Sequence, residues 1–448
     1  MPTKHDPSRP TTDIAEAWRR FDPARPLEPG SPWWVDCAGA RDARDIVDAI
    51  ATRLDWAAAG GPPEEQCVHE LVAGHRGCGK STELLRLTER LRRDGFFVSY
   101  FPVTDYVDEQ DVEFGDVLLT VARQVLVDLA KGGVQLPKKL LESLREWFAE
   151  KVREHVTEKV DEYQVDVEGR IGVGIPVLKF MARCLAAIRG KEESRERVRL
   201  MVRDTMEDLM GRINEILIRA GGQLRRTKKA KGLVIIVDNL DRVPSPEQQK
   251  RIFVEHADQL NRLACHCLYT VPTSLIYSPE GRPVESLFGA PSFVPVIKIA
   301  EKDGEPFGPG RRALREIVHK RAAEDLFKRG VVDKLCDFSG GHPRDLVRLV
   351  RAACHEARTP PVAMAAAERA CQELTRGFAR WLTDEDFGRL RRLADDPDKD
   401  VDKDDPHKRL IFYAAVLPYW NGYAWYDVHP AIKILPKFKR PPEAAQDE

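Results

Sequence analysis

The sequence predicts an α/β fold built on a parallel sheet, and three observations support this prediction. A glycine-rich loop lies between an apolar run at 68–73 and an amphipathic stretch that opens at Thr82. The aromatic and β-branched run 96–103 follows after a short turn, so strand, helix and strand imply a right-handed crossover. A third run, 233–237, is uninterrupted and ends in acid, as expected of a central strand covered on both faces.

The glycine-rich loop fits the G-x-x-x-x-G-K-[ST] phosphate-binding pattern (P-loop) at every required position. Its glycines let backbone N–H groups approach a polyphosphate, and the helix N-terminus adds positive potential. An ordinary glycine-rich turn is the alternative. The predicted strand, loop and helix follow one another as in a P-loop, however, which favours phosphate binding. We expect Lys80 to reach the β- and γ-phosphates of ATP and Ser81 to bind Mg²⁺. The predicted nucleotide site comprises Gly74, His75, Arg76, Gly77, Cys78, Gly79, Lys80, Ser81 and Thr82.

Composition limits the class of protein and of partner. The 448 residues carry 71 Lys+Arg against 72 Asp+Glu, so no global field attracts nucleic acid, although a local basic patch stays open. The nine scattered cysteines suggest free thiols, and Cys265-His266-Cys267 is too tight and isolated to argue for zinc. We see neither a signal peptide nor a run of about 18 uncharged apolar residues, so we expect a cytoplasmic protein without a membrane span.

The chain divides into four predicted parts. Residues 1–30 form a Pro- and Arg-rich extension that is mobile or lies across a neighbour, and 31–310 form the α/β core. Residues 311–376 are helical, and 377–448 combine helices with a β-hairpin at Asn421-Gly422, which suggests a winged-helix-like module. Trp33-Trp34 either covers a bound adenine or anchors domain packing, and a helix is expected over 41–54.

Within the core, residues 105–231 have the i, i+3, i+4 pattern of a large helical insertion. Its glycine-punctuated segment 165–174 is expected to form a hairpin or loop. The basic run 225–231 could contact a phosphate backbone, but a solvated turn before a strand is the favoured interpretation.

Beyond the insertion, the acidic end of the 233–238 strand carries candidate residues for metal binding and catalysis. Asp238 stands where a carboxylate holds Mg²⁺ through water or through Ser81, and Asp241 stands where a base or a polarising group for the attacking water belongs. Strands are expected over 265–271 and 293–299, with Arg282 in a Pro/Gly-containing loop between them.

These motifs resemble the AAA+ and STAND branch of P-loop ATPases, including the NACHT and KAP groups, over roughly residues 31–376. Gly74–Ser81 is similar to Walker A and Val234–Asp241 to Walker B. The resemblance implies a helical lid over 311–376 in which Arg344 of Gly341-His342-Pro343-Arg344 contacts the γ-phosphate, and a sensor at Thr270 or Thr273. From its location in the sequence, Arg282 is the implied arginine finger that acts on a neighbouring subunit, and Arg321 and Arg262 are the alternative candidates. Because Asn239 follows Asp238 in the segment similar to Walker B, the resemblance leaves open that ATP hydrolysis is slow.

The implied function is an ATP-driven, Mg²⁺-dependent oligomeric switch, with a role in bacterial antiphage defence and a separate effector partner suggested by family analogy. The alternative is a DNA-handling AAA+ ATPase, such as a transposition regulator or an initiator-like loader. A small-molecule kinase fits the strand-terminal acids and the lid less well. A binding-only protein that has lost hydrolysis is a further alternative because of Asn239.

Overall fold

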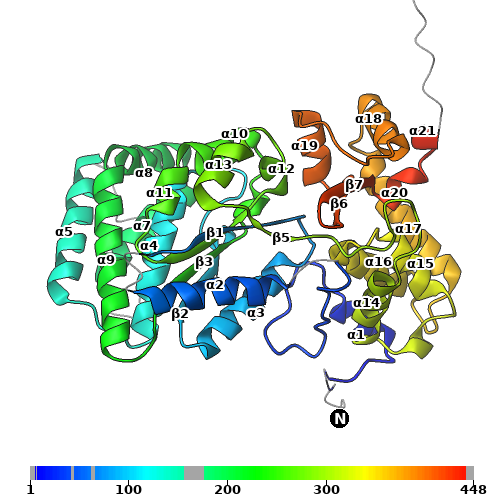
Figure 1. Ribbon diagram of the computed structural model, residues 1–448, viewed down its shortest axis with the longest axis horizontal. Helices are drawn as coiled ribbons and strands as arrows, with labels where there is room; N and C mark the ends of the chain where they lie inside the picture. The colour runs from blue at the N-terminus through cyan, green and yellow to red at the C-terminus, as the bar shows by residue number, and fades with distance from the viewer. Residues whose placement is uncertain (1–5, 7, 42–44, 62–65, 156–175, 440–448) are drawn as a thin grey trace, which may run out of the picture. The chain divides into compact units, whose positions relative to one another are not determined.

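The computed structural model describes residues 6, 8–41, 45–61, 66–155 and 176–439 (Figure 1). The predicted hairpin or loop at 165–174 lies outside these residues. The contacts divide the chain into two compact units. The first contains 1–46, 74–85 and 293–448, and the second contains 47–73 and 86–292. Each unit is described by itself.

A five-stranded sheet has the order β2-β3-β4-β1-β5, and the pairs β2–β3, β3–β4 and β4–β1 are parallel. All six residues of β3 and all six of β4 are buried, as expected of central parallel strands covered on both faces. The predicted α/β fold with a parallel sheet is therefore confirmed. The strands are β1 (His69–Gly74), β2 (Phe97–Pro102), β3 (Leu233–Asp238), β4 (His266–Val271) and β5 (Ser292–Val294).

The fifth strand is shorter than the predicted 293–299. It ends at Val294 because the next residue, Pro295, has no N–H group to continue a ladder. Beyond the proline, the Ile297 N–H donates to Gly341 O at 3.2 Å and the Lys298 N–H to Ala40 O at 3.0 Å. This segment therefore bonds to loops of the first unit.

In the second unit, helices occupy most of the described chain between β2 and β3. Among them, α4 contacts β2 and β3, α9 contacts β3, and α7 contacts α4, α5 and α8. Figure 1 shows α5 at the outer edge of this layer. The apolar face of α7 is buried against these helices, which explains its hydrophobic sequence. Their bounds are α4 (Phe114–Lys131), α5 (Lys138–His155), α7 (Pro176–Arg189), α8 (Glu192–Asp204) and α9 (Met206–Arg226).

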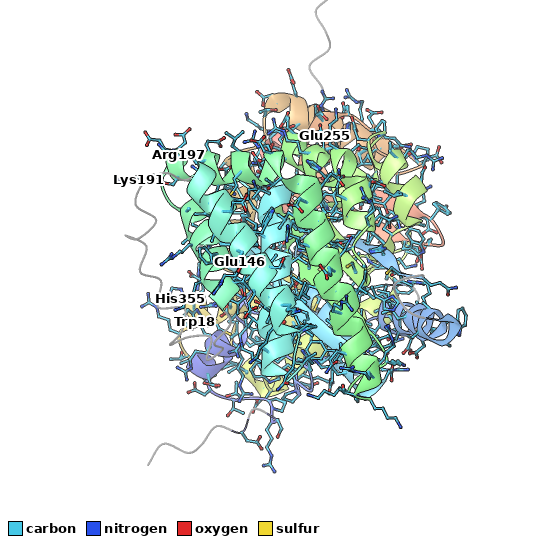
Figure 2. All side chains as sticks on the ribbon, turned by 90° about the vertical axis from the view of Figure 1, so that its left-hand side faces the viewer. Trp18, Glu146, Lys191, Arg197, Glu255 and His355 are labelled. Carbon is cyan, nitrogen blue, oxygen red and sulfur yellow. The ribbon has the colours of Figure 1, made fainter. Side chains whose placement is uncertain are left out.

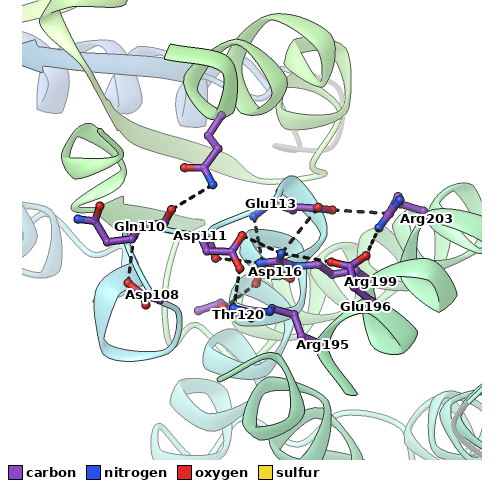
Figure 3. A network of polar contacts seen from close by, with 11 residues as sticks. Asp108, Gln110, Asp111, Glu113, Asp116, Thr120, Arg195, Glu196, Arg199 and Arg203 are labelled. Carbon is purple, nitrogen blue, oxygen red and sulfur yellow. Dashed lines mark hydrogen bonds and ion pairs between the residues drawn. The ribbon is translucent and has the colours of Figure 1, made fainter. Parts of the chain in front are cut away.

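A buried ionic network, shown in Figure 3, joins α4 to α8. Arg199 of α8 lies 2.6 Å from Asp116 of α4 and 2.9 Å from Asp111, and the side chains of Arg199 and Asp116 are 3% and 1% exposed. Asp116 also accepts a hydrogen bond from the Glu113 N–H at 3.0 Å, completing the capping box of α4. Burial would lower the pKa of Arg199, but its carboxylate partners raise it, so this residue is a permanent cation.

The basic run 225–231 packs against its own unit. The Lys229 ammonium donates to Gly132 O and Gly133 O, while Lys231 pairs with Asp55 at 2.6 Å and lies 4.4 Å from the centre of the Phe96 ring. These contacts favour the interpretation as a turn. The second unit is completed by α2 (Ile46–Gly60), most of α3 (Lys80–Arg93), α10 (Pro246–Lys250), α11 (Ala257–Asn261), α12 (Thr273–Ile276) and α13 (Gly281–Phe288).

In the first unit, α16 packs against α15, α17 and the N-terminal helix α1. Residues 14–20 are therefore a docked helix, contrary to the expectation of an extension that is mobile or lies across a neighbour. Helix formation follows from the Asp13 cap, whose carboxylate accepts from the Glu16 N–H at 2.6 Å. The helices are α1 (Ile14–Arg20), α14 (Gly308–His319), α15 (Val331–Phe338), α16 (Pro343–Ala357) and α17 (Met364–Ala379).

The C-terminal module contains the predicted hairpin, with β6 and β7 antiparallel. Tyr419 stacks on Trp425 with ring centres 4.6 Å apart, and both pack with Val296 and Leu417. The Tyr419 hydroxyl donates to Gly340 O at 2.6 Å, so the hairpin is fixed to the turn before α16. Its elements are α18 (Asp384–Asp395), α19 (Asp405–Phe412), β6 (Val416–Trp420), β7 (Ala424–Val428), α20 (Pro430–Lys433) and α21 (Pro436–Lys439).

Trp33 acts as a packing anchor in the first unit. The guanidinium groups of Arg20 and Arg321 each lie 5.7 Å from the centre of its ring. Arg321 is 6% exposed and donates to Ile317 O at 2.7 Å, so it is a core residue unsuited to reach a neighbouring subunit. In the described residues, none of the helices has both the length and the apolar character needed to cross a bilayer.

Candidate active site

The P-loop connects the end of β1 to the first residue of α3, Lys80. Gly77 and Gly79 have φ angles of 98° and 105°, which side chains rarely adopt. Gly77 is required for a second reason: a Cβ atom there would lie 2.7 Å from His342 Nε2 and 2.8 Å from Arg344 Cβ. The loop is therefore shaped both by its own turn and by the segment that covers it.

Several polar groups of this loop suit a bound polyphosphate. In the described part of the chain, the N–H groups of Gly77 and Gly79 and the hydroxyl of Ser81 have no protein partner. Amides beside a helix N-terminus are donors for phosphate oxygens, and a serine hydroxyl is an oxygen ligand for Mg²⁺. The residues present therefore fit ATP and Mg²⁺.

The Lys80 ammonium is folded onto the loop. It donates to Gly74 O at 2.5 Å and to His75 O at 3.0 Å, and the residue is 5% exposed. Its charge is thus held over the loop's own carbonyls, at the position from which a P-loop lysine reaches phosphate. Thr82, also predicted in the site, accepts a hydrogen bond from the Leu27 N–H at 3.3 Å.

Arg41 supports the P-loop and was missed in the sequence. Its guanidinium donates to Cys78 O at 2.6 Å and pairs with Glu83 at 3.1 Å, and a Cβ on Gly79 would lie 3.2 Å from it. Arg41 therefore fixes the loop to the first turn of α3. The residue falls in the predicted helix 41–54, but the helix begins only at Ile46, and no local pattern distinguishes this arginine.

The segment before α16 contacts the loop directly. His342 Nε2 lies 2.8 Å from Arg76 O, and the Arg344 N–H donates to Gly77 O at 3.3 Å. The structure thus brings the backbone of Arg344 beside the P-loop. Pro343 starts α16 at a position where a proline costs no hydrogen bond, which lets the tight turn at Gly340-Gly341 lead straight into the helix.

A buried histidine network extends from these contacts. The rings of His75 and His342 meet edge to face with centres 5.5 Å apart, and His342 Nδ1 lies 2.7 Å from the Asp345 carboxylate. His429 Nε2 lies 3.5 Å from the same carboxylate, and His75 Nε2 donates to the carbonyl of Ile411 in α19. The P-loop is therefore joined to the C-terminal module by two routes. We refer to His75, His342, Asp345 and His429 as the histidine network.

Burial determines the charges in the histidine network. Burial and the neighbouring His342 lower the pKa of His75 to about 3, so its ring is neutral at pH 7. Burial likewise lowers the pKa of His429. Burial would raise the pKa of Asp345, but its hydrogen bonds and attraction to His342 and His429 hold that pKa well below the usual range. The sequence contained no signal for this network, because its members are separated by up to 354 residues, from His75 to His429 (429 − 75).

The predicted Walker B residues lie in the second unit. Asp238 ends β3 and is 1% exposed; its carboxylate accepts from the Tyr100 hydroxyl at 2.8 Å and from the Asn239 N–H at 2.7 Å. A buried carboxylate at the carboxyl end of a central parallel strand fits a metal-binding role. Tyr100 of β2 is a second residue that the sequence did not single out.

Asn239 turns the chain from β3 toward Asp241. Its backbone is left-handed, with φ 68° and ψ 8°, and its side-chain amide donates to the Thr104 hydroxyl at 3.0 Å. The short turn that follows, Leu240–Arg242, carries Asp241, which is 7% exposed. The Leu240 N–H donates to the Thr270 hydroxyl at 3.0 Å, so of the two candidate sensors Thr270 contacts this turn, while Thr273 begins α12.

Arg282 lies on a helix, which corrects the predicted loop. It is the second residue of α13, its side chain is 84% exposed, and it pairs with Glu285 one turn later at 3.4 Å. Pro283 falls in the first turn of this helix, where it is tolerated, so the proline did not indicate a loop. Arg262 is engaged with Glu207 and Asp258, each at 3.5 Å.

The cysteines and one acidic cluster provide further potential metal ligands. All nine cysteines are free, as predicted, and Cys265 Sγ and Cys267 Sγ lie 3.7 Å apart on buried residues. Among the described residues, one group of three potential metal ligands is present, Asp402, Asp404 and His407, and its two aspartates are exposed.

Comparison with known proteins gave structural similarity only. No protein-family model and no curated protein matches the chain. The solved structures that match include Drosophila ORC bound to DNA (TM-score 0.39, 13% identity, 88% of this chain and 74% of that chain). They also include Cdc6p of Pyrobaculum aerophilum (0.39, 11%, 92% and 94%) and a Walker-type ATPase of Pyrococcus abyssi (0.42, 11%, 92% and 98%). At these scores and identities the likeness reaches no further than the general α/β fold.

Proposed function

We propose that the chain is a Mg²⁺-dependent ATPase of the AAA+ and STAND kind that acts as an oligomeric molecular switch. One observation carries this proposal. The P-loop offers unpartnered donors for a polyphosphate, two of its carbonyls accept hydrogen bonds from the lid, and its His75 side chain donates to a carbonyl of the C-terminal module in the same unit. A loop that only bound nucleotide would not need these connections.

Each predicted residue has a defined task. Lys80 and the loop amides bind the β- and γ-phosphates, and Ser81 and Asp238 hold Mg²⁺, which neutralises phosphate charge when bound. Asp241 orients the attacking water and accepts its proton, and Arg344 from the lid stabilises the charge on the γ-phosphate. Exposed Arg282 is the candidate for action on a neighbouring subunit.

The switch follows from the contacts of the loop. A phosphate that draws Lys80 away from Gly74 O and His75 O changes the backbone to which His342 and Arg344 are bonded. The same backbone carries His75, which bonds to α19. Gain and loss of the γ-phosphate would therefore alter both the lid and the C-terminal module.

Two variants test the chemistry. Lys80→Ala should weaken binding of a fluorescent ATP analogue at least 100-fold. Asp241→Asn should retain binding but lower phosphate release at least 100-fold. Arg329→Ala, an exposed residue before α15, is the control and should change neither measurement. Normal ATP binding by Lys80→Ala would refute the P-loop assignment, and normal turnover by Asp241→Asn would remove Asp241 from its role.

Light scattering tests the oligomeric part of the proposal. Asp241→Asn with ATP should form a larger assembly than the same protein with ADP. A constant monomer in both states would contradict the oligomeric switch and the role of Arg282, while leaving the ATPase assignment intact. The defence role and the separate effector partner rest on the family resemblance alone.

A DNA-handling ATPase is the second candidate function. It is favoured by a groove in the first unit that is lined by Arg348, Arg351, Arg376 and Arg380. Assembly that requires DNA as well as ATP would place this candidate first.

A further inference from the structure

We propose that a groove between α1, α16 and α17 binds single-stranded nucleic acid. Phosphates would pair with its arginines, and a base would stack on Trp18. The groove has a volume of about 660 Å³ and lies within the first unit. We call it the arginine groove and define it by Trp18, Arg348, Arg351, His355, Arg376 and Arg380.

The basic residues that line the arginine groove form two rows. Arg348, Arg351 and His355 follow one another at i, i+3 and i+7 on α16, so they share one helix face. Arg376 and Arg380 are four residues apart at the end of α17. The lining contains one carboxylate, Glu373, and thus carries a strong excess of positive charge.

Two of these arginines make no ion pair with the described residues. Arg376 and Arg380 are exposed, and the described part of the chain supplies neither with an ion pair. By contrast, Arg348 pairs with Asp345 at 3.1 Å and Arg351 with Asp22 at 3.3 Å. Guanidinium groups bind phosphate oxygens through paired donors, so a chain of phosphates complements these side chains.

Trp18 indicates bases rather than acidic peptide as the partner. It is a large aromatic residue left 38% exposed, and the Arg351 guanidinium lies 3.9 Å from its ring centre. Figure 2 labels Trp18 and His355 near one another, and both residues line the groove. Aromatic rings among cations are what single-stranded nucleic acid needs, because every base has a face to stack.

The dimensions favour a single strand over a duplex. The groove has the volume of a small-molecule site, which suits one or two unstacked nucleotides. A base can stack on Trp18 only if its face is open, which base pairing and stacking within a duplex prevent. The groove shares no residue with the predicted nucleotide site, so this inference stands apart from the proposed ATPase activity.

Fluorescence anisotropy with the full chain tests the inference. Labelled 16-nucleotide oligo-dT and oligo-rU serve as probes, without ATP, over a series of salt concentrations. Arg376→Glu/Arg380→Glu should weaken binding at least tenfold. The slope of log affinity against log salt should become shallower by about 1.4, because two phosphate contacts at about 0.7 each are lost.

Trp18→Ala should act differently from the arginine variant. It should weaken binding about 5- to 150-fold by removing base stacking and leave the salt slope unchanged. Lys328→Glu/Arg329→Glu is the matched control, because both residues are exposed in the same unit but outside the groove. It should bind like the wild type, and so should Lys80→Ala, which separates this result from any failure of the ATPase proposal.

Three outcomes would overturn the inference. They are wild-type affinity in both groove variants, tighter binding of a 16-base-pair duplex than of either single strand, or equal competition by polyglutamate. A circular dichroism spectrum matching the wild type shows that the variants are folded. If Arg376→Glu/Arg380→Glu does not fold, Arg376→Gln/Arg380→Gln replaces it, with the same expected change in slope. Binding of DNA, RNA or both supports the shared chemistry, and a preference for RNA assigns recognition of the 2′-hydroxyl.

Discussion

The helical insertion and the P-loop unit each bury a polar network, and the two networks differ in the groups that carry charge. In the insertion, the buried Arg199 guanidinium is held by two carboxylates, at 2.9 Å from Asp111 and 2.6 Å from Asp116. In the first unit, the Asp345 carboxylate faces His342 and His429, and His342 and His75 also contact backbone carbonyls of the P-loop and of α19. The first network joins two helices through charged side chains alone, whereas the second also depends on the backbone of the P-loop.

The largest expected effect is on the insertion. Arg199→Met leaves Asp116 buried without its cation and should destabilise the α4–α8 contact by about 3–5 kcal/mol. Hydrogen exchange of amides in these two helices measures this loss. Arg203→Met removes a half-exposed arginine from the edge of the same network and should cost about 1 kcal/mol or less. If amide hydrogen exchange in α4 and α8 is unchanged in Arg199→Met, the network does not stabilise the insertion.

A smaller effect is expected in the histidine network. Asp345→Asn retains the shape but removes the charge that His342, His429 and Arg348 face, and should cost about 1–3 kcal/mol in α16. Because His342 bonds to the P-loop, ATP affinity should fall as well. Glu356→Gln makes the same charge change in a surface ion pair of α16 and should affect neither. Loss of stability without any change in ATP affinity would reduce the network to a structural role.

The smallest effect is one of pH, and its direction follows from His75. The pKa of His75 is about 6.5 when unfolded and about 3 when folded, so the unfolded chain binds more protons between these values. Stability is therefore complete above pH 6.5 and falls by about 1.4 kcal/mol for each pH unit below it. Amide exchange in α19, corrected for the intrinsic rate, should rise from pH 7.5 to 5.5, whereas α8 should change less. His75→Asn should abolish the pH dependence, and its persistence in that variant would exclude His75 as the cause.

The parts predicted well from the sequence depend on local patterns. Five consecutive apolar positions followed by an aspartate identified β3, and the spacing of Gly74, Gly79 and Lys80 identified the loop, because each pattern is complete within a few residues. The end of the fifth strand was wrong by five residues because apolar character beyond Pro295 serves packing with the C-terminal hairpin. Arg282 was misplaced because a proline in the first turn of a helix resembles one in a loop.

The groups that support the site were not predictable in this way. Arg41, Tyr100 and His429 act through contacts with segments distant in the chain, and none stands in a repeated or spaced pattern. Their roles follow from how the chain folds back on itself. Long-range polar contacts of this kind have no local signature in one sequence.

The left-handed turn at Asn239 limits how this chain can change. Replacing it with glutamate would place two acidic residues side by side at the end of β3. The new residue, however, would have to adopt a backbone conformation that asparagine tolerates better, and it would lose the amide bonded to Thr104. A second carboxylate would also adjoin Asp238 at the buried end of β3. The single substitution of Asn239 by glutamate is therefore expected to destabilise the turn that separates Asp238 from Asp241.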